Sequence, residues 1–283
     1  MIIALFHNTG KKQSRDIAIK IVAFLQQHSI TVVAEDDDAA SIGAQSLSSI
    51  PEPEVNFCIT LGGDGTILRL VHKHPNLQVP ILAINLGSLG FMADITTNHI
   101  EASLKNLING CFQIESRMVI EGKTPTKQIN FAINEIVVHR SSHPSLINLA
   151  IYVDGRYLNT FSADGVIVST PSGSTAYSLA AGGPILVPEL NALVLTPICP
   201  HTISNRPIVL LPEQEIRIEY IGPCTTAEVA FDGVPCYALS TGESVSIVRS
   251  NRLFRLVNMP DHDYFATLRS KLEWSGGLKN TSL

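Results

Sequence analysis

The hydrophobic pattern of the chain changes after Gly110, and this change most constrains the fold. In the first hundred residues, short apolar runs that suit buried strands alternate with stretches of helical spacing. Residues 14–29 place Ile17 and Ile21 on one helical face. Ser14 is the candidate N-cap of that helix. Strands that alternate with helices in this way predict a doubly wound, Rossmann-like parallel sheet.

Past Gly110 one strand-like stretch follows another. Turn residues separate seven of them: 127–140, 145–161, 165–171, 206–212, 214–222, 226–239 and 244–250. They predict a β-rich, sandwich-like domain. Residues 263–274 return to helical spacing and are expected to pack on the first domain. With 283 residues available, we predict an α/β domain at 1–100, completed by about 260–283, and a β-rich domain at 101–259.

Composition excludes several classes of protein. The net charge of −5 argues against a broad basic surface, so no nucleic-acid partner is predicted. No apolar stretch approaches the ~18 residues that cross a bilayer, and the start lacks the basic region of a signal peptide. The five cysteines share no metal-type spacing and indicate reduced thiols in a cytoplasmic protein. The acidic cluster 35–38 is interpreted as a solvated loop.

The segment "TLGGDGTILRL" at 60–70 places one acid among three glycines between a strand and a helix. Ligands of open parallel sheets bind beyond the carboxyl ends of the strands. Glycines there let the backbone approach a ligand, and the first N–H groups of the helix bind anions. An acid in an anion site indicates phosphoryl transfer, where a hydroxyl loses its proton or Mg²⁺ is held. The alternative is a turn in which Asp64 only caps the helix.

Two further segments carry polar groups that suit a ligand. Residues 162–184 contain an Asp-Gly pair, a strand, a run of hydroxyl and glycine residues, and Tyr177 beside a short helix. They suit a polar ligand with a flat ring, although the hydroxyl groups could simply cap the helix. Asn134 and Glu135 lie between apolar strand residues, where an unpaired polar group costs about 1–3 kcal/mol. A binding role and a structural hydrogen bond are both open for this pair.

Other signatures are missing from the sequence. There is no GxxxxGK[ST] segment of a Walker-type ATPase and no GxSxG hydrolase motif. Residues 87–91, "GSLGF", are too short for the dinucleotide fingerprint. His72 and His74 are two residues apart on a predicted helix and therefore point in different directions. No metal-ligating residue is predicted.

The chain resembles the NAD kinase family, because it carries three of that family's motifs in the same order. They are GGDG at 62–65, the pair Asn134–Glu135 and the long motif at 164–177. The similarity also includes "INLGSLGF", "GGPIL" and the terminal "YFATLRSKLEWS", so it covers nearly the whole chain. GGDG alone is shared with phosphofructokinases and with diacylglycerol- and sphingosine-type lipid kinases, whereas the long motif is specific.

The resemblance implies that ATP, or another phosphate donor, phosphorylates NAD to NADP with Mg²⁺. Asp64 then matches the general base for the 2′-hydroxyl of the adenosine ribose. The implied donor-phosphate residues are Gly62, Gly63, Gly65 and Thr66. The implied NAD-binding residues are Asp64, Gly65, Asn134, Glu135, Asp164, Thr175, Ala176, Tyr177, Ser178, Leu179 and Ala180. Within this set, Asp164 matches a contact to the nicotinamide end, and Tyr177 is expected to stack on a ring. Family members are commonly homotetramers or dimers, so a homo-oligomer is expected.

Three positions depart from the family pattern. Ser162 and Ser145 stand where many members have basic residues, and Val234 stands where many have Gln. Arg140 and His143 are close to the second of these positions. Two alternative functions are a lipid or sugar kinase that shares GGDG, and a non-catalytic nucleotide sensor on the same fold.

Overall fold

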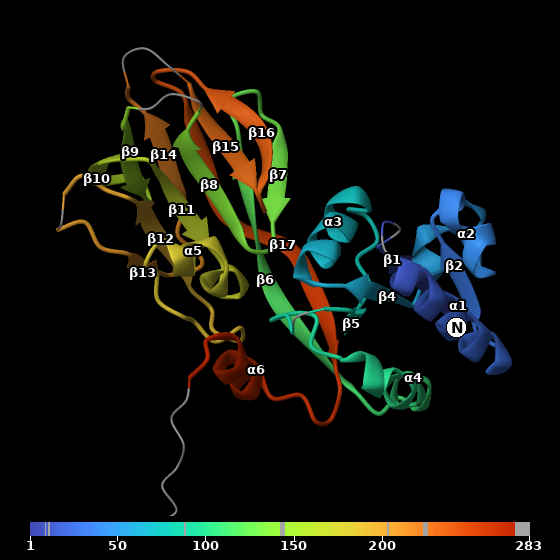
Figure 1. Cartoon of the computed structure of the whole chain (residues 1–283). Coiled ribbons are helices and arrows are strands. Elements are labelled where there is room, and N and C mark those ends of the chain that lie inside the picture. Colours follow the sequence, from blue (N-terminus) through green and yellow to red (C-terminus); the bar gives the residue numbers. More distant parts are fainter. Residues whose placement is uncertain are drawn as a thin grey trace, which may run out of the picture. The chain divides into compact units, whose positions relative to one another are not determined.

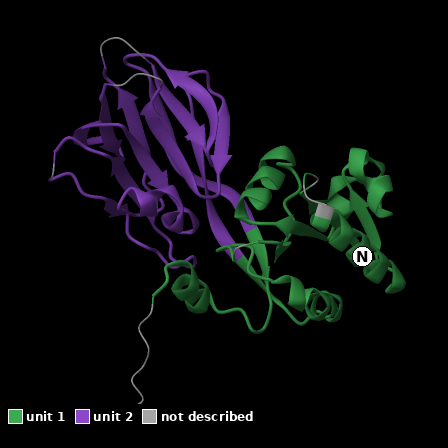
Figure 2. Cartoon of the chain, in the orientation of Figure 1, with its two compact units in different colours: residues 1–115, 255–283 green, residues 116–254 purple. Residues whose placement is uncertain are grey.

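The computed structural model describes residues 1–8, 10, 12–87, 89–141, 145–202, 204–222 and 226–274. The chain forms two compact units (Figure 2). Unit 1 comprises residues 1–115 and 255–283, and unit 2 comprises residues 116–254. Unit 2 is thus inserted between the two parts of unit 1. The division into compact units does not test the predicted domain boundaries near residues 100 and 260, which therefore remain a prediction.

Unit 1 is built on a parallel sheet, as predicted (Figure 1). Its strands are, in spatial order, β3 (Gln45–Ser46), β2 (Thr31–Ala34), β1 (Ile2–His7), β4 (Phe57–Gly62) and β5 (Ile81–Asn85). The chain goes from β1 to β2 on one side and later places β4 on the other side of β1, with parallel pairing throughout. The strand order therefore reverses between β1 and β4, where open α/β sheets bind ligands.

Helices and the sheet of unit 1 share one apolar core. The helices are α1 (Lys12–Gln27), α2 (Asp36–Ile42), α3 (Asp64–Lys73), α4 (Ile100–Asn109) and α6 (Tyr264–Lys271), with 3₁₀ turns at Leu47–Ser49, Glu52–Glu54 and Thr97–His99. Strand residues such as Leu5, Ile59 and Leu82 are fully buried with Leu25 of α1 and Leu104 of α4. Strands buried on both faces explain the continuous apolar runs of this half.

Two local predictions and one alternative interpretation in unit 1 are wrong. α1 begins at Lys12, so Ser14 lies inside its first turn, fully buried, where its Oγ accepts the N–H of Asn8 at 3.2 Å. Asp64 is the first residue of α3, and Gly63 occupies the N-cap position. The acidic cluster is not a loop, because Asp36 begins α2. Three aspartates in a first helical turn are favourable, since they face the positive end of the helix dipole.

Unit 2 is antiparallel and β-rich, as predicted. One sheet has the order β13 (Ile208–Leu210), β12 (Leu193–Ile198), β11 (Gly165–Ser169), β8 (Glu135–Arg140), β15 (Ala227–Phe231) and β16 (Val234–Leu239). The other strands are β6 (Gln113–Lys123), β7 (Ile129–Ala132), β9 (Ile147–Val153), β10 (Arg156–Ala163), β14 (Ile216–Tyr220) and β17 (Ser244–Asn258). β6 and β12 were not predicted, and β17 is longer than the predicted strand at 244–250. The chain passes between the units within β6 and within β17.

The core of unit 2 lies between its sheets. Alternate residues of the central strands, such as Ile136, Val138 and Val166, join it together with Ile218 of β14. Val137 points to the opposite face with Ile167 and Ile198, in a small cluster that Ala181 covers. The short helix α5 (Tyr177–Ala180) and the 3₁₀ turn Ser172–Thr175 immediately precede that residue. The polar motif is therefore carried on the outer face of the central strands (Figure 1).

In the described part of the chain, no helix has the length and apolar character that a membrane span requires.

Candidate functional site

The side chain of Asp64 does not cap its own helix. Its Oδ2 accepts the backbone N–H of Phe91 at 2.9 Å, and its Oδ1 accepts those of Met92 at 3.1 Å and Ala93 at 3.0 Å. The loop comes this close because residue 90 is glycine, on which a Cβ atom would lie 2.1 Å from Asp64 Oδ1. Three backbone donors thus fix the orientation of one carboxylate.

The loop that holds Asp64 is itself fixed by Asn85, the last residue of β5. Asn85 is buried, its Nδ2 donates to the carbonyl of Ala93 at 3.0 Å, and its Oδ1 accepts the N–H of Gly87 at 2.6 Å. The backbone N–H of Asn85 also donates to Ile95 O at 2.7 Å. One side chain therefore joins the beginning and the end of the loop.

Residues around α6 contact the same loop within unit 1. His262 Nδ1 pairs with the carboxylate of Asp94, and the ring of Tyr264 lies 6.4 Å from that of Phe91. α6 is capped by Asp263, which accepts two N–H groups of its first turn. The C-terminal helix returns to the first domain, as predicted.

The glycines of the GGDG motif leave the backbone open at the start of α3. A Cβ atom on Gly62 would lie 2.2 Å from Thr66 Oγ1, whereas positions 63 and 65 face open space. Thr66 Oγ1 accepts from Arg69 Nη2 at 3.3 Å. The first turn of α3 thus offers backbone N–H groups, a hydroxyl and a guanidinium together, which suits an anion.

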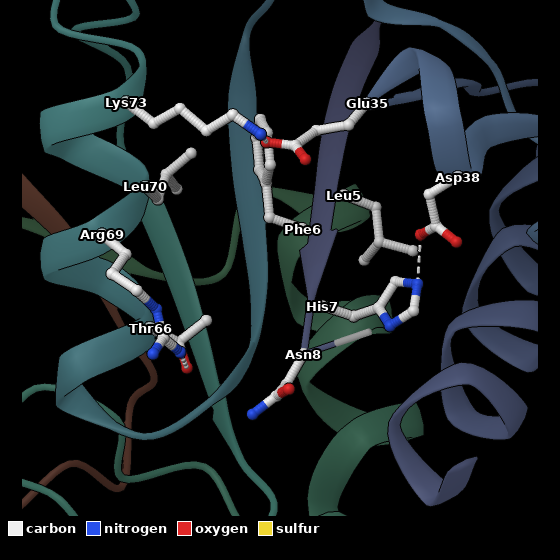
Figure 3. Close-up of a pocket in the computed structure, with 10 residues that line it drawn as sticks. All are labelled: Leu5, Phe6, His7, Asn8, Glu35, Asp38, Thr66, Arg69, Leu70 and Lys73. Carbon is white, nitrogen blue, oxygen red and sulfur yellow. Dashed lines mark hydrogen bonds and ion pairs between the residues drawn. The ribbon is translucent and has the colours of Figure 1, made fainter. Parts of the chain in front are cut away.

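A cavity of about 370 Å³ opens beside this turn (Figure 3). Its lining comes from the end of β1, the residues after β2, and one face of α3: Leu5, Phe6, His7, Asn8, Glu35, Asp38, Thr66, Arg69, Leu70 and Lys73. We call it the switch-point pocket, because it lies where the strand order reverses.

Charged groups of the switch-point pocket are paired across it. Glu35 Oε1 contacts Lys73 Nζ at 2.6 Å and His74 Nε2 at 3.1 Å. Burial alone would raise the pKa of Glu35, but hydrogen bonds and charge from Lys73 and His74 prevail and lower it. Asp38 pairs with Nε2 of His7, whose side chain is only 1% exposed. Two of the four acids of the cluster, Glu35 and Asp38, therefore line a pocket, whereas Asp36 and Asp37 are exposed to solvent as predicted.

In unit 2, Asn134 and Glu135 are both buried. The carboxylate of Asp232 accepts the backbone N–H groups of Ile133 at 2.8 Å, Asn134 at 2.8 Å and Glu135 at 3.2 Å. Asp232 and Gly233 both have positive φ angles, 47° and 78°, in the two-residue turn between β15 and β16. This turn fits a type I′ hairpin and orients the aspartate.

Two side-chain atoms of this pair have no partner among the described residues, Asn134 Oδ1 and Glu135 Oε2. Burial and the charge of Asp232 raise the pKa of Glu135 to about 8, although the N–H of Tyr177 opposes them. Near neutral pH the carboxyl group is therefore largely protonated, and it presents a donor as well as an acceptor. Buried polar atoms without a protein partner point to a ligand.

The long motif meets the Asn-Glu pair directly. Thr170 Oγ1 donates to the carbonyl of Ile133 at 2.6 Å, and a Cβ atom on Gly173 would lie 2.1 Å from the carbonyl oxygen of Asn134. Tyr177, whose N–H reaches Glu135, is 45% exposed. Within unit 2 the structure thus brings together two segments that the sequence analysis singled out separately.

The remaining predicted residues of the motif have mixed surroundings. Thr175 Oγ1 donates to Ser172 O at 3.1 Å, and buried Ser178 Oγ bonds Thr196 Oγ1 at 2.9 Å. Ala176 precedes α5, and Leu179 and Ala180 lie on it. The N-cap residues of the two short helices, Pro171 and Ala176, make no side-chain capping hydrogen bond. Thr170 Oγ1 accepts the N–H of Gly173 at 3.1 Å, but Ser174 and Thr175, which could have been caps, donate to carbonyl groups.

Asp164 is paired with Arg140, whose Nε lies 2.7 Å from Asp164 Oδ1. A second cavity of about 370 Å³ lies there, lined by His139, Arg140, Ser141, Asp164, Tyr177 and Ile198. The guanidinium of Arg140 thus supplies a positive charge beside Asp164, although residues 145 and 162 are serines and not basic residues. His143 lies outside the described residues.

Sequence reasoning missed His7, Arg69, Lys73, Asn85 and Asp232. The signal for Arg69 and Lys73 was present, because spacings of three and seven residues put them on the same helical face as Thr66 of the motif segment. Asp232 lies in an Asp-Gly hairpin signal, but nothing local indicates its partners. Among the described residues no group of three or more His, Cys, Asp or Glu side chains could hold a metal ion.

Comparisons with known proteins give one consistent result. Residues 3–112 match the family described as ATP-NAD kinase N-terminal domain, and residues 133–259 match the ATP-NAD kinase C-terminal domain. The chain is 56% identical over 278 residues to an NAD kinase of Protochlamydia amoebophila, covering 98% of this chain and 100% of that one. It is 37% identical over 280 residues to an NAD kinase of Moorella thermoacetica, with 97% and 90% covered.

Two solved structures are similar over most of the chain. Yeast NADH kinase complexed with NADH has a TM-score of 0.90 and 27% identity, and the match covers 99% of this chain and 90% of that chain. An NAD kinase from Archaeoglobus fulgidus in complex with ATP has a TM-score of 0.75 and 26% identity, with 95% and 99% covered.

Proposed function

The chain belongs to the NAD kinase family, and we propose that it phosphorylates the 2′-hydroxyl of the adenosine ribose of NAD, with Asp64 as general base. A kinase that uses NAD and ATP is what the family membership establishes. The position of the hydroxyl and the role of Asp64 are our proposal. The orientation of the Asp64 carboxylate by three backbone N–H groups is the observation that carries it.

A carboxylate offers about four lone-pair positions. Two N–H groups occupy Oδ1 and one occupies Oδ2, which leaves one position on Oδ2 for a substrate proton. A sugar hydroxyl is a weak nucleophile near neutral pH, and a positioned base typically accelerates its attack by about 10²–10⁴-fold. We assign the proton transfer to Asp64 Oδ2.

The donor phosphates are assigned to the first turn of α3. Gly63 and Gly65 leave the backbone of this turn open to an anion. Thr66 supplies its hydroxyl group, since its own N–H donates to the carbonyl of Gly63 at 2.8 Å. Mg²⁺ commonly binds through substrate phosphates, one or two carboxylates and water, so we propose that it enters with ATP. When bound, it neutralises charge on the transferred phosphoryl group.

Unit 2 is assigned the binding of NAD. The unpartnered atoms Asn134 Oδ1 and Glu135 Oε2 would bind the ribose and adenine region, and the exposed ring of Tyr177 would stack on a base. Asp164, already paired with Arg140, would contact the nicotinamide end. The segment from Thr175 to Ala180 would line the remainder of this pocket.

We also propose that the enzyme is a cytoplasmic homo-oligomer, a dimer or tetramer. The strands at the two edges of one sheet of unit 2, β13 and β16, expose Val209 and Val234, and Leu211 follows β13. An edge strand with exposed apolar side chains can pair with another chain. Light scattering on the purified protein would measure the number of subunits.

The proposed reaction is tested by incubating the enzyme with NAD and ATP, with and without Mg²⁺. We expect a dinucleotide that an NADP-specific dehydrogenase reduces and whose phosphorus spectrum identifies a 2′-phosphate. Diacylglycerol and fructose 6-phosphate should accept no phosphate in parallel assays. A 3′-phosphate, or NAD binding without turnover, would contradict the proposal.

A further inference from the structure

The position of the switch-point pocket in the fold predicts that it binds a nucleotide. It lies where the strand order reverses between β1 and β4, and the crevice at such a point is where open α/β sheets bind nucleotides. One wall is α3, the helix that carries the proposed donor-phosphate turn. The opposite wall is formed by the residues that follow β2.

Glu35 is the first residue after β2. In dinucleotide-binding sheets, an acid near the end of the second strand accepts hydrogen bonds from ribose hydroxyls. Lys73 and His74 both contact the same carboxylate oxygen of Glu35, Oε1. Oε2 has no partner among the described residues and remains available as an acceptor. Figure 3 shows the carboxylate beside the Lys73 ammonium at the edge of the cavity.

A second polar group of the pocket also lacks a partner. The His7 ring is buried and its Nε2 pairs with Asp38, but its Nδ1 has no hydrogen-bond partner among the described residues. A buried ring nitrogen is costly unless something bonds to it. Leu5, Phe6 and Leu70 supply apolar lining next to it, as expected for a pocket that takes a flat base and a polar sugar.

The length of α3 fits a nucleotide that reaches from one end to the other. Lys73, which pairs with Glu35, is nine residues from Asp64, a spacing of about 13 Å along the helix axis. A ribose with an extended triphosphate covers a span of this order. Thr66 and Arg69 lie between the two ends on the pocket wall.

We propose that the switch-point pocket binds the nucleoside half of the phosphate donor, whose ribose hydroxyl groups donate hydrogen bonds to Glu35 Oε2. The triphosphate then runs along α3 past Arg69 and Thr66 to the GGDG turn. This inference rests on the proposed function, because it assigns the switch-point pocket to the phosphate donor of the proposed reaction. It makes Glu35 the residue that distinguishes a nucleotide from a bare polyphosphate.

The test compares ATP, 2′,3′-dideoxy-ATP and inorganic tripolyphosphate as ligands of the whole enzyme, by calorimetry and as donors or inhibitors. Wild-type enzyme should bind ATP at least about tenfold more tightly than dideoxy-ATP, since hydrogen bonds to a charged acceptor are stronger than those between neutral groups. In Glu35→Gln this preference should fall to within twofold, with the KM for ATP raised about tenfold and kcat at saturating ATP unchanged. Tripolyphosphate binding should not change.

Asp37→Asn is the matched control. It removes the same charge from the neighbouring helix, but Asp37 is exposed and lies outside the pocket lining. This variant should keep the wild-type preference for ATP over dideoxy-ATP. Glu35→Asp keeps the charge but shortens the side chain, and it should retain only part of the preference.

Equal binding of ATP and dideoxy-ATP by the wild type would overturn the proposal. So would an unchanged preference in Glu35→Gln, or equal losses of ATP and tripolyphosphate binding, because the acid would then act on the phosphates or on the fold. The calorimetric binding measurements do not depend on turnover. A wild type that discriminates the ribose but forms no NADP would therefore refute the proposed function alone.

Discussion

Gly90 and Asp64 are so close that a Cβ atom on residue 90 would lie 2.1 Å from Asp64 Oδ1. The bare backbone at Gly90 allows the following three residues to turn their N–H groups onto the carboxylate. A residue that contributes no side chain thereby determines where the proposed base lies.

Gly90→Ala should displace the Asp64 carboxylate and lower kcat at least tenfold, because misplacing a reacting group by about 1 Å can cost up to about 10²-fold. NAD binding should stay within threefold. Steady-state kinetics and NAD titration measure both. Gly87→Ala is the control, since its Cβ would meet nothing closer than 3.9 Å. Equal kinetics for the two variants would remove the proposed role of Gly90.

Asn85→Ala removes both side-chain hydrogen bonds that join the ends of the loop. We expect the amides of Phe91, Met92 and Ala93 to exchange with solvent faster, and kcat to fall more than the affinity for NAD. Hydrogen exchange read by NMR or mass spectrometry follows the loop. Protection as strong as in the wild type would show that Asn85 does not hold it.

Asp64→Asn should lower turnover at least a hundredfold and leave NAD binding within several-fold. An amide oxygen can accept two of the three N–H groups, so about 1–3 kcal/mol of stability should also be lost. Chemical denaturation measures that loss. In Asp64→Ala, added formate should restore part of the turnover if the missing group is a base. Near-normal turnover in Asp64→Asn would remove the general-base assignment.

Tyr177→Ala should weaken NAD binding more than it slows the chemical step, because the exposed ring is assigned to stacking. Base–aromatic stacking contributes about 1–3 kcal/mol, or roughly 5- to 150-fold in affinity. Tyr157→Ala, which removes another exposed ring of unit 2, should leave NAD binding unchanged. A loss of kcat alone in Tyr177→Ala would refute stacking.

Glu135 should make the unliganded protein less stable as the pH rises. Burial raises its pKa from 4.5 to about 8, so between these values the folded state holds a proton that the unfolded chain has released. Stability then falls with pH across this window, by an upper limit of roughly 5 kcal/mol. Glu135→Gln should abolish this fall and be more stable than the wild type at pH 8. Urea denaturation at pH 5 and pH 8 measures the difference, and parallel pH dependences in both proteins would contradict the assignment.

Much of the fold could be predicted because buried positions recur as regularly spaced apolar residues in the sequence. Parallel strands such as β5 are apolar throughout, and the helices between them repeat every three to four residues. β12 was missed because Pro197 interrupts its apolar run, although the residue pairs with Val166. β6 was missed because its first half is mostly exposed and polar.

The candidate site was only partly predictable for a different reason. Asp64, Asn134 and Glu135 stand in recognisable motifs, but nothing next to them in the sequence indicates what holds them. Backbone N–H groups, which no residue type marks, hold Asp64, and the carboxylate of Asp232 holds the backbone of Asn134 and Glu135. The partners are also distant in sequence, since Asp232 accepts from Asn134 across 98 positions. Which carboxylate meets which amide is decided by the packing of strands and turns.

The insertion of unit 2 into unit 1 has a consequence for biosynthesis. His262 and Tyr264, which hold the loop around the proposed base, are translated only after every residue of unit 2. A nascent chain can therefore complete its antiparallel sheets while the loop that orients Asp64 still lacks its last support. Phosphorylating competence would be acquired late, after α6 has left the ribosome.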